Sequence, residues 1–317
     1  MKIRDQAAYD AYWYFAAERQ RMFFKRFRRE AVPWTEDRTL QKFSFTNAYR
    51  ASDRVSQHLI SSVIPAGSQE PNEVFFRVML FKIFNKIETW DLLTQTLGEA
   101  PSALHFNAEH YGNILREAMA DGVTVYAGAY MMKGPARGGS KHEMHLGWLS
   151  EMIRKRFGEG LAEARHCQQA WFALTQWDGI GPFLAYQYAT DLAYADCFRW
   201  GEGEFTCPGP GSGRGIARCF DLEGSEPRRA IEFMYARQGL DGKAAGFQNL
   251  WGRDLQLIDC QNIFCELDKY LALSADEGTH AGKRRQFRSG GARIVYRYPE
   301  KWGLNEKIQH EGKRGAA

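Results

Sequence analysis

Residues 177–185 read WDGIGPFLA, and this stretch decides how we interpret the rest of the chain. A predicted helix ends at Trp177, Gly179 and Gly181 bracket one apolar residue, and a second helix begins with Pro182, where a missing N–H costs nothing. The first N–H groups of that helix then point outward and can bind a phosphate. The pattern is typical of a helix-hairpin-helix, which binds the DNA backbone without reading its sequence. The alternative is an ordinary glycine-capped connection between two helices.

The sequence around the hairpin predicts an all-α protein with, at most, a small pair of strands. Apolar residues recur at helical spacing, and we expect helices at residues 5–30, 45–64, 75–96, 103–121, 143–157, 160–177, 226–238 and 256–271. Residues 123–127 are a candidate strand. Residues 201–216, with six glycines and two prolines, are predicted to be irregular. The polar tail beyond residue 304 is predicted to be loose.

The composition fits a folded protein and permits DNA binding. Hydrophobic residues make up 44% and charged residues 25% of the chain, which excludes wholesale disorder. Aromatic residues reach 14%, either as core or as stacking partners for bases. The formal charge is only +4, but basic residues cluster at 25–29 and 283–288. No signal peptide and no apolar run of about 20 residues is present, so we expect a cytoplasmic protein.

The cysteines predict no metal site, and we expect no cofactor. A zinc ribbon needs paired C-x-x-C steps, and the closest pair here is Cys260 and Cys265. An iron–sulfur site needs four clustered cysteines. The six cysteines are therefore expected to be reduced thiols; they are Cys167, Cys197, Cys207, Cys219, Cys260 and Cys265.

Residues 207–216 read CPGPGSGRGI and predict a loop that binds an anion. Gly209, Gly211 and Gly213 would expose consecutive N–H groups, and Arg214 adds a guanidinium that suits a phosphate or pyrophosphate. The alternative is a structural loop rich in glycine and proline.

Polar residues that interrupt predicted helices are candidates for a base pocket. Asn47 and Arg50 share one face of predicted helix 45–64, and Asp53 lies beside them in sequence. Asn85 and Lys86 interrupt an apolar helix in the same way, and Gln261 and Asn262 belong to predicted helix 256–271. Buried polar groups are costly unless they are satisfied. These residues therefore form either a pocket or a structural buried network.

Five blocks of sequence, in order, resemble the α-glutamyl/putrescinyl-thymine pyrophosphorylase family. They are FTNAYRASDR at 45–54, FNKIETW at 84–90, the hairpin leading to Asp191, PGPG with RGI at 208–216, and DCQNIFCELDKY at 259–270. The resemblance implies a helix-hairpin-helix DNA-glycosylase-like fold used to hypermodify thymine in DNA. It also implies a functional link to kinases that phosphorylate 5-hydroxymethyluracil in DNA, and a bacterial or phage-infected host cell.

The implied reaction replaces a phosphate or pyrophosphate on the 5-methylene carbon with an amine. The expected partners are double-stranded DNA carrying phosphorylated 5-hydroxymethyluracil and an amino acid or polyamine. The enzyme must flip the base out, bind the departing anion and accept a proton from the amine. Asp191, Glu204 and Glu266 are the candidates for that base or for binding the ammonium group. Each of the three is alternatively structural.

The predicted organisation has three parts. Residues 1–40 form an N-terminal helical extension, residues 41–275 a glycosylase-like domain with the hairpin near 160–192, and residues 276–317 a basic C-terminal extension. Two other functions stay open. One is a DNA glycosylase for a modified pyrimidine, although no Val-Asp-Thr-like step follows the hairpin. The other is a non-catalytic DNA-binding module that recruits a kinase.

Overall fold

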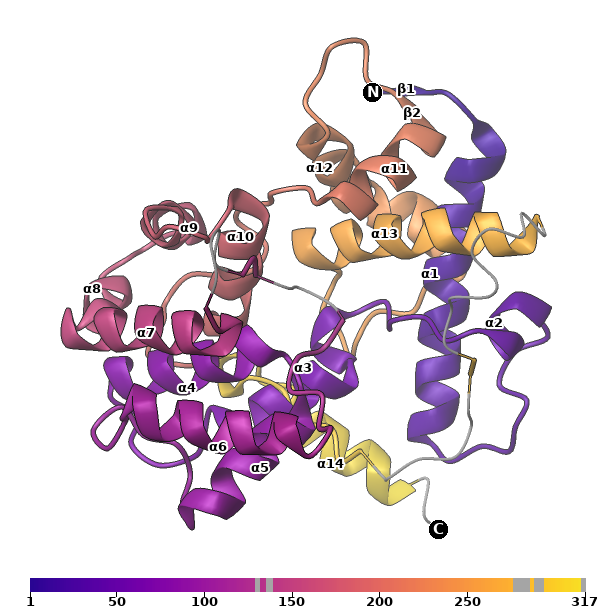
Figure 1. The fold of residues 1–317 in the computed structure, drawn as a ribbon. Coiled ribbons are helices and arrows are strands. Elements are labelled where there is room, and N and C mark those ends of the chain that lie inside the picture. Colours follow the sequence, from indigo (N-terminus) through magenta and orange to yellow (C-terminus); the bar gives the residue numbers. More distant parts are fainter. Residues whose placement is uncertain (129–131, 135–138, 276–285, 288–293, 315–317) are drawn as a thin grey trace. The chain divides into compact units, whose positions relative to one another are not determined.

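The structure is a computed structural model, and it describes residues 1–128, 132–134, 139–275, 286–287 and 294–314. These residues are mainly α-helical (Figure 1). Their only named strands are β1 (Lys2–Ile3) and β2 (Phe220–Asp221), which pair antiparallel. The prediction of an all-α protein with a small strand pair is therefore confirmed. The more specific glycosylase-like fold stays a prediction.

The chain divides into two compact units that each combine distant segments. Unit 1 comprises Met1–Asp53, Phe205–Tyr296 and Gly303–Ala317, and unit 2 comprises Arg54–Glu204 and Arg297–Trp302. The expected N-terminal extension thus lies in the same unit as most of the chain beyond residue 205. The three-part division stays a prediction.

Unit 1 is built around two helices that are distant in sequence, α1 (Gln6–Phe27) and α13 (Leu257–Ser274). Asp5 begins α1 by accepting hydrogen bonds from the amides of Ala7 and Ala8. Aromatic side chains then pack the two helices together, with the rings of Tyr12 and Phe264 centred 4.6 Å apart. Shorter elements complete the unit: α2 (Arg38–Lys42), η1 (Arg50–Ser52), α11 (Pro210–Cys219), α12 (Arg228–Arg237), η3 (Gln238–Gly242) and α14 (Asn305–Arg314).

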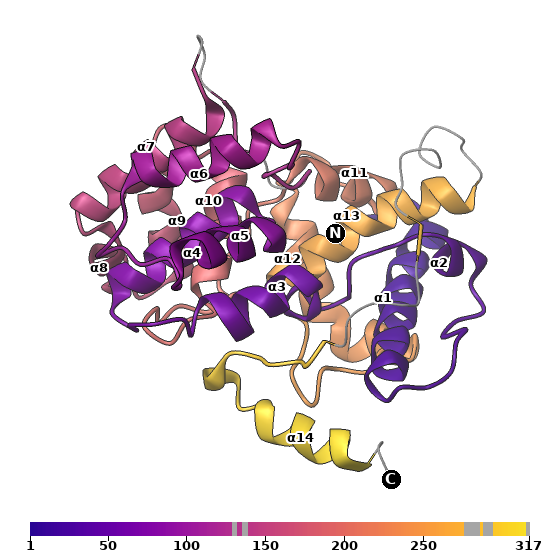
Figure 2. The same cartoon turned by 60° about the horizontal axis from the view of Figure 1, so that its bottom comes forward.

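The prediction of an irregular segment over residues 201–216 is wrong for its second half, because α11 begins at Pro210. The glycines allow the backbones of two helices to approach closely, since α11 lies along α13 in Figures 1 and 2. A Cβ added at Gly215 would lie 2.0 Å from the carbonyl oxygen of Phe264, and one at Gly211 would lie 2.5 Å from Sγ of Cys265. Close packing on α13 therefore outweighs the low helix propensity of glycine.

Unit 2 surrounds α4 (Pro71–Phe84), whose residues from Val74 to Phe84 are all buried. Helices α7 (Lys141–Arg154), α8 (Phe157–Ala162) and α10 (Pro182–Leu192) pack against it. The remaining elements are α3 (Arg54–His58), η2 (Leu59–Val63), α5 (Ile87–Leu97), α6 (Ala108–Ala120), α9 (Cys167–Thr175) and η5 (Glu300–Trp302).

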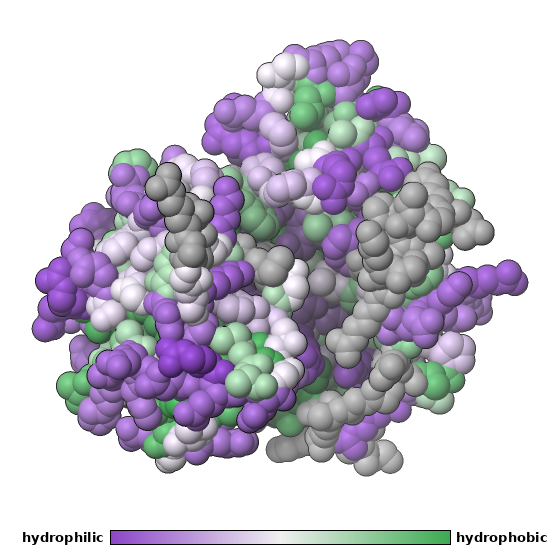
Figure 3. Space-filling view, in the orientation of Figure 1, coloured by the Kyte–Doolittle hydropathy of each residue, from purple (hydrophilic) through white to green (hydrophobic). Residues whose placement is uncertain are grey.

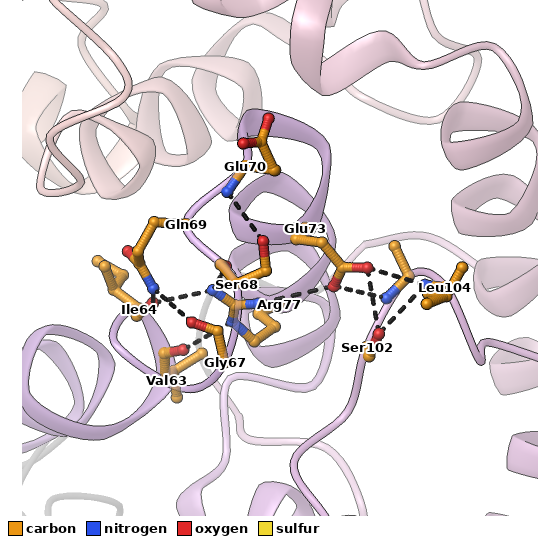
Figure 4. Close-up of polar contacts among 11 residues, drawn as sticks. Val63, Ile64, Gly67, Ser68, Gln69, Glu70, Glu73, Arg77, Ser102 and Leu104 are labelled. Carbon is orange, nitrogen blue, oxygen red and sulfur yellow. Dashed lines mark hydrogen bonds and ion pairs between the residues drawn. The ribbon is translucent and has the colours of Figure 1, made fainter.

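A buried arginine stabilises the turn between η2 and α4 (Figure 4). Arg77 is 1% exposed and donates to three main-chain carbonyls, those of Val63, Ile64 and Ser68, at 2.7–3.1 Å. These carbonyls follow the last turn of a helix, where acceptors lack partners within the helix. Glu73 lies 3.6 Å from the same guanidinium and balances its charge.

Residues 297–302 form a short strap that completes unit 2. The side-chain amide of Gln57 donates to the carbonyl of Arg297 at 3.0 Å and accepts from its N–H at 2.9 Å. The Lys301 ammonium donates to the carbonyls of Ala195 and Phe198 at 3.0 and 2.8 Å. Lys301, near the end of the strap, therefore binds a turn that precedes it by more than a hundred residues.

Three predicted helices are interrupted. Residues 45–49 are irregular, and only η1, α3 and η2 follow within the predicted helix 45–64. The helix predicted at 75–96 breaks at Asn85, which adopts the left-handed conformation with φ +50°. The helix predicted at 160–177 breaks before α9, where the side chain of Gln169 accepts from the amides of Arg165 and His166.

Two further expectations are corrected by the structure. Residues 123–127 form no strand. The tail beyond residue 304 contains α14, because Glu311 of this helix forms an ion pair with Arg28 at 2.8 Å and Lys307 donates to the carbonyl of Trp251. These contacts, all within unit 1, supply the stability that a polar helix lacks alone.

The surface is mostly polar on the face drawn in Figure 3, with apolar residues scattered among hydrophilic ones. Within the described residues, no helix has both the length and the apolar character needed to cross a membrane. The basic run at 283–288 falls outside the described residues except for Gln286 and Phe287.

Candidate functional sites

The glycine hairpin forms between α9 and α10 as the sequence predicts. Gly179 has φ +84°, and the buried Ile180 donates its N–H to the carbonyl of Trp177 at 3.1 Å. Gly181 is the N-cap of α10 and Pro182 is its first residue. The two glycines of the motif were both expected to adopt the unusual φ values of a tight turn, and for Gly181 this is wrong. Its φ of −72° can be adopted by any residue, so only Gly179 needs the freedom of glycine.

The two glycines also differ in the space around them. A Cβ at Gly179 would lie 2.3 Å from the ring of Trp148, whereas a Cβ at Gly181 would meet nothing within 4 Å. The start of α10 is therefore open at Gly181. Lys155 lies 5.1 Å from the ring centre of Trp177 and adds positive charge beside the hairpin. The N–H groups of a helix start and a nearby cation suit a phosphate.

Asp191 and Asn85, predicted for different roles, are brought together by Lys82. The Lys82 ammonium lies 3.2 Å from Oδ2 of Asp191 and donates to Oδ1 of Asn85 at 2.7 Å. All three side chains are buried, and Asp191 is 0% exposed. Such a closed ion pair does not offer a free base, so Asp191 fits a structural or binding role better than proton transfer. Lys86 lies outside this group and donates to the carbonyl of Thr124.

Glu204 binds main-chain amides of its own unit. Its carboxylate accepts from the N–H of Cys167 at 3.2 Å and from that of Gly201 at 3.0 Å. His166 lies 3.5 Å away. The contact with Cys167 stabilises the start of α9, as negative groups do at helix N-termini. These contacts give Glu204 a structural role at the start of α9, and no catalytic role is needed to explain its position.

Unit 1 contains a polar cluster centred on Arg19, which we call the Arg19 cluster: Arg19, Asn47, Arg50, Asp53 and Glu266. The buried guanidinium of Arg19 donates to the carbonyls of Phe45 and Thr46 at 3.0 Å each and to Oδ1 of Asn47 at 3.2 Å. The N–H of Asn47 donates to Oδ1 of Asp53 at 2.8 Å. Arg19 thereby holds residues 45–47 outside any helix, so Asn47 and Arg50 do not share a helix face as predicted.

The Arg19 cluster contains two neighbouring carboxylates with different surroundings. Glu266 is buried, accepts from the Lys269 ammonium at 2.6 Å and from the amide of Thr46 at 3.3 Å. Asp53 is partly exposed. Burial, together with the charge of Glu266, raises the pKa of Asp53 to about 7, against the lowering effect of the Asn47 hydrogen bond, Arg19 and Arg50.

This arrangement can accept a proton at neutral pH. A general base is most effective when its pKa lies near the working pH, and Asp53 combines such a pKa with partial exposure of the residue. The sequence placed Asp53 in the base pocket and gave Glu266 as one of three candidates, with Asp191 and Glu204, for the base or for binding the ammonium group. The geometry favours Asp53 as the base, with Glu266 acting on it.

Helix α13 contributes one more acid that the sequence reading missed. Asp259 accepts from the amide of Arg50 at 2.8 Å and from that of Gln256 at 2.9 Å, so it joins η1 to the start of α13. Gln261 is 3% exposed and Asn262 is partly exposed. No contact connects either of them to Asp53 among the described residues, so their place in a base pocket stays a prediction.

Arg19 and Lys82 were also missed, although each gives a signal in the sequence. Each is a charged residue whose helix places buried apolar side chains three and four positions before it. Burying a charge is costly unless it is paired. A charged residue on the apolar face of a predicted helix therefore marks a buried network.

The predicted anion-binding residues lie at the start of α11. Gly209 is its N-cap, and Gly211, Gly213 and Arg214 lie within the helix. The Nε of Arg214 donates to Asp268 at 2.9 Å, and Arg218 donates to the other oxygen of that carboxylate at 2.8 Å. The Arg214 side chain is still 61% exposed. Binding of an anion here stays a proposal, and it would involve a helix start rather than a loop.

The described part of the chain holds no group of three or more residues of metal-ligating type. All six cysteines are free thiols, and burial raises the pKa of Cys167, Cys219 and Cys207 above the ordinary value.

The fold and these sites define an all-α protein with a glycine hairpin between two helices and two clusters of buried charged side chains. The chain belongs to the family of 5-hmdU DNA kinase helical domains, whose model matches residues 6–280. It is 24% identical over 304 residues to a 5-hmdU DNA kinase of Bacillus phage SP10. The match covers 86% of this chain and 46% of the phage protein, so the chain spans about half the length of that relative. No solved structure matches it.

The family refines the resemblance suggested by the sequence. Membership of this family agrees with the expected connection with modification of 5-hydroxymethyl-deoxyuridine in DNA, and the relative is a phage protein. The family is that of the kinase helical domain, however, and not that of a pyrophosphorylase. The replacement of phosphate by an amine therefore belongs to the proposals below.

Proposed function

We propose that this chain is a DNA base-modifying transferase that replaces the phosphate or pyrophosphate on phosphorylated 5-hydroxymethyl-deoxyuridine with an amine. The observation that carries the proposal is Asp53, a partly exposed residue of the Arg19 cluster whose carboxyl pKa is raised to about 7, in a chain of the 5-hmdU DNA kinase helical-domain family. The amine would be an amino acid or a polyamine, as the resemblance implies.

The proposed step forms one bond and breaks one. The nitrogen lone pair attacks the 5-methylene carbon, the C–O bond to the phosphate breaks, and the phosphate or pyrophosphate leaves with that electron pair. The nitrogen gains positive charge as the C–N bond forms, and its proton passes to Asp53. Arg214 is our proposed ligand for the departing anion, since a guanidinium can bind two phosphate oxygens.

The product analysis that tests this function is mass spectrometry of nucleosides. Duplex DNA containing 5-hydroxymethyl-deoxyuridine, first phosphorylated by a 5-hmdU DNA kinase, would be incubated with the protein and a pool of amino acids and polyamines. We expect a nucleoside in which an amine has replaced the phosphate. Alkali-labile abasic sites without such a nucleoside would instead identify a glycosylase.

The hairpin is proposed to bind the DNA backbone, and Gly181 gives a direct test. We expect Gly181→Phe to weaken duplex binding by about 10–100-fold, because the ring would cover N–H groups that donate to a charged phosphate. The melting temperature should change little, since nothing lies within 4 Å of the added Cβ. Electrophoretic mobility shift and thermal denaturation measure the two effects.

Gly239→Phe is the matched control, because Gly239 of η3 is also exposed with nothing within 4 Å of an added Cβ. It should leave DNA binding unchanged. Normal duplex binding by a folded Gly181→Phe variant would show that the hairpin only connects two helices.

The match to about half of a phage kinase favours a second candidate, a DNA-binding module that presents the modified base to a kinase. The sequence has no G-x-x-x-x-G-K-[ST] phosphate-binding loop, and we propose no phosphoryl transfer through one in this chain. The module would bind the DNA and stimulate a separate kinase without releasing any aminated nucleoside. Substitution of Asp53 and Glu266 would then leave its function intact.

A further inference from the structure

Helix α10 carries three fully buried polar residues on one face, directly after the hairpin. Gln187, Tyr188 and Asp191 are each 0% exposed. Their spacing of three and four residues places the side chains of Gln187 and Tyr188 beside that of Asp191. Asp191 in turn pairs with Lys82 and, through it, with Asn85 of α4. We call these five residues the α10 cluster.

The α10 cluster contains polar atoms that nothing in the described structure satisfies. Both Oε1 and Nε2 of Gln187 lack a hydrogen-bond partner there, and so does the hydroxyl of Tyr188. Buried polar groups are nearly always paired in folded proteins, because leaving them unpaired is costly. Three such atoms on one helix face therefore indicate a site that is completed by a ligand.

The charges of the α10 cluster restrict what that ligand can be. Lys82 lies 3.2 Å from Asp191, so the two opposite charges already balance each other. A further phosphate or ammonium group would be buried without a counter-charge, which is expensive. A neutral ligand with a donor next to an acceptor fits better, because the amide of Gln187 offers the complementary pair in one plane.

We infer that the α10 cluster binds the imide edge of a flipped uracil-type base, with Gln187 paired to its N3–H and a neighbouring carbonyl. This inference rests on the proposed binding of DNA that contains a modified uracil. Enzymes that act on bases take them out of the helix and recognise their Watson–Crick edge by hydrogen bonds. The 5-position of the ring, which carries the modification, is not part of that edge.

Tyr126 lies between the α10 cluster and the helix that contacts the hairpin. It is partly exposed and is electrostatically coupled to Tyr188, whose pKa is raised chiefly by burial. Its hydroxyl lies 2.9 Å from Nδ1 of His145, whose Nε2 lies 3.0 Å from the carbonyl of Lys133. Burial lowers the pKa of His145 to about 4, so the ring is neutral and donates through Nε2. Tyr126 therefore donates to Nδ1, and the ring of His145 stacks on Trp148, the side chain that contacts Gly179.

The test compares two duplexes that differ in a single base. The first carries one 5-hydroxymethyl-deoxyuridine opposite an abasic analogue, so no base pair has to be broken. The second has the abasic analogue on both strands at that position. We expect the wild-type protein to prefer the first duplex. Gln187→Leu should lose about ten-fold or more in affinity for the first duplex and bind the second normally.

A second measurement separates a ligand site from a structural defect. Leucine is apolar and similar in size, so Gln187→Leu removes both unpaired atoms and should raise the melting temperature by about 2–4 °C. Tyr188→Phe should likewise lower the affinity for the first duplex and raise the melting temperature. The control is Gln20→Leu in α1 of unit 1, where a buried Nε2 also lacks a partner in the described structure. It should leave the preference between duplexes unchanged.

The inference would be overturned if Gln187→Leu were more stable than the wild type but kept its preference for the first duplex. It would also be overturned if Gln187→Leu had a lower melting temperature than the wild type. A wild-type protein that did not prefer the first duplex would overturn it as well. Neither duplex is phosphorylated on the base and no amine is added. Failure of amine transfer would thus contradict the proposed function while leaving this binding result valid.

Discussion

Asp53→Asn is expected to lower turnover of phosphorylated 5-hydroxymethyl-deoxyuridine DNA by about 10²–10⁴-fold, the usual contribution of a general base. Asparagine keeps an oxygen that can accept from the amide of Asn47, so the local structure should persist. In the wild type, turnover should fall as the pH drops below about 7, because Asp53 becomes protonated. This acidic limb should be absent from the residual activity of the variant. Single-turnover rates between pH 5 and 9 measure both effects.

The same substitution should stabilise the protein in a pH-dependent way. The pKa of Asp53 is raised in the folded state, so the folded protein binds this proton more tightly than the unfolded chain does. Its contribution to stability is therefore present at low pH and is lost as the pH rises from about 4 through about 7. Asp53→Asn should thus raise the melting temperature more at pH 8 than at pH 5. Asp10→Asn, an exposed change on α1, is the control, and it should leave the melting temperature unchanged at both pH values.

Normal turnover of Asp53→Asn at pH 8 would show that Asp53 is not the base. If product still forms, Glu266 becomes the remaining carboxylate of the Arg19 cluster to test. If the wild type forms no aminated nucleoside at all, the DNA-binding module gains support instead.

Gly215→Ala is expected to destabilise unit 1 by about 3 kcal/mol or more, the upper end for overpacking. The new methyl group would lie 2.0 Å from the oxygen and 2.8 Å from the carbon of the Phe264 carbonyl. Both atoms belong to the backbone of α13 and cannot rotate away, so the two helices have to separate. A melting temperature lower by ~10 °C is the expected readout in thermal denaturation.

Gly213→Ala on the same helix is the matched control with the opposite sign. Nothing lies within 4 Å of its added Cβ, and alanine is the better helix former. It should stabilise the protein by about 0.5–1 kcal/mol. A melting temperature of Gly215→Ala within about 2 °C of the wild type would show that the spacing of α11 and α13 is not set by this glycine.

Local features of the fold were predictable from the sequence, and contacts between distant segments were not. Helices α1 and α10 begin through interactions within a few residues, and their starts agree with those predicted at residue 5 and at Pro182. Helix α11 was missed because its glycines disfavour a helix until α13 covers them. The break at residues 45–49 was missed because Arg19, on another helix, holds their carbonyls.

The candidate sites show the same limit. The sequence selected Asp53 and Glu266 separately, for different roles, because nothing local indicates that α13 brings Glu266 beside Asp53. It selected Asp191 without its partner Lys82, which lies on another helix of unit 2. The hairpin could be predicted except for the φ of Gly181, since its turn, the buried Ile180 and the start of α10 all lie within residues 177–185.

The strap at residues 297–302 has a consequence for the order in which the chain folds during synthesis. Residues 54–204 of unit 2 leave the ribosome as one continuous segment, whereas unit 1 needs residues 205–296 before α11 and α13 can meet α1. The helices of unit 2 can therefore pack first, while residues 1–53 wait for their partners. The strap, with Arg297 and Lys301, is the last part of unit 2 to be synthesised and binds helices that have already packed. In a nascent chain stalled before residue 297, the helices of unit 2 would be packed but would still lack the hydrogen bonds of the strap.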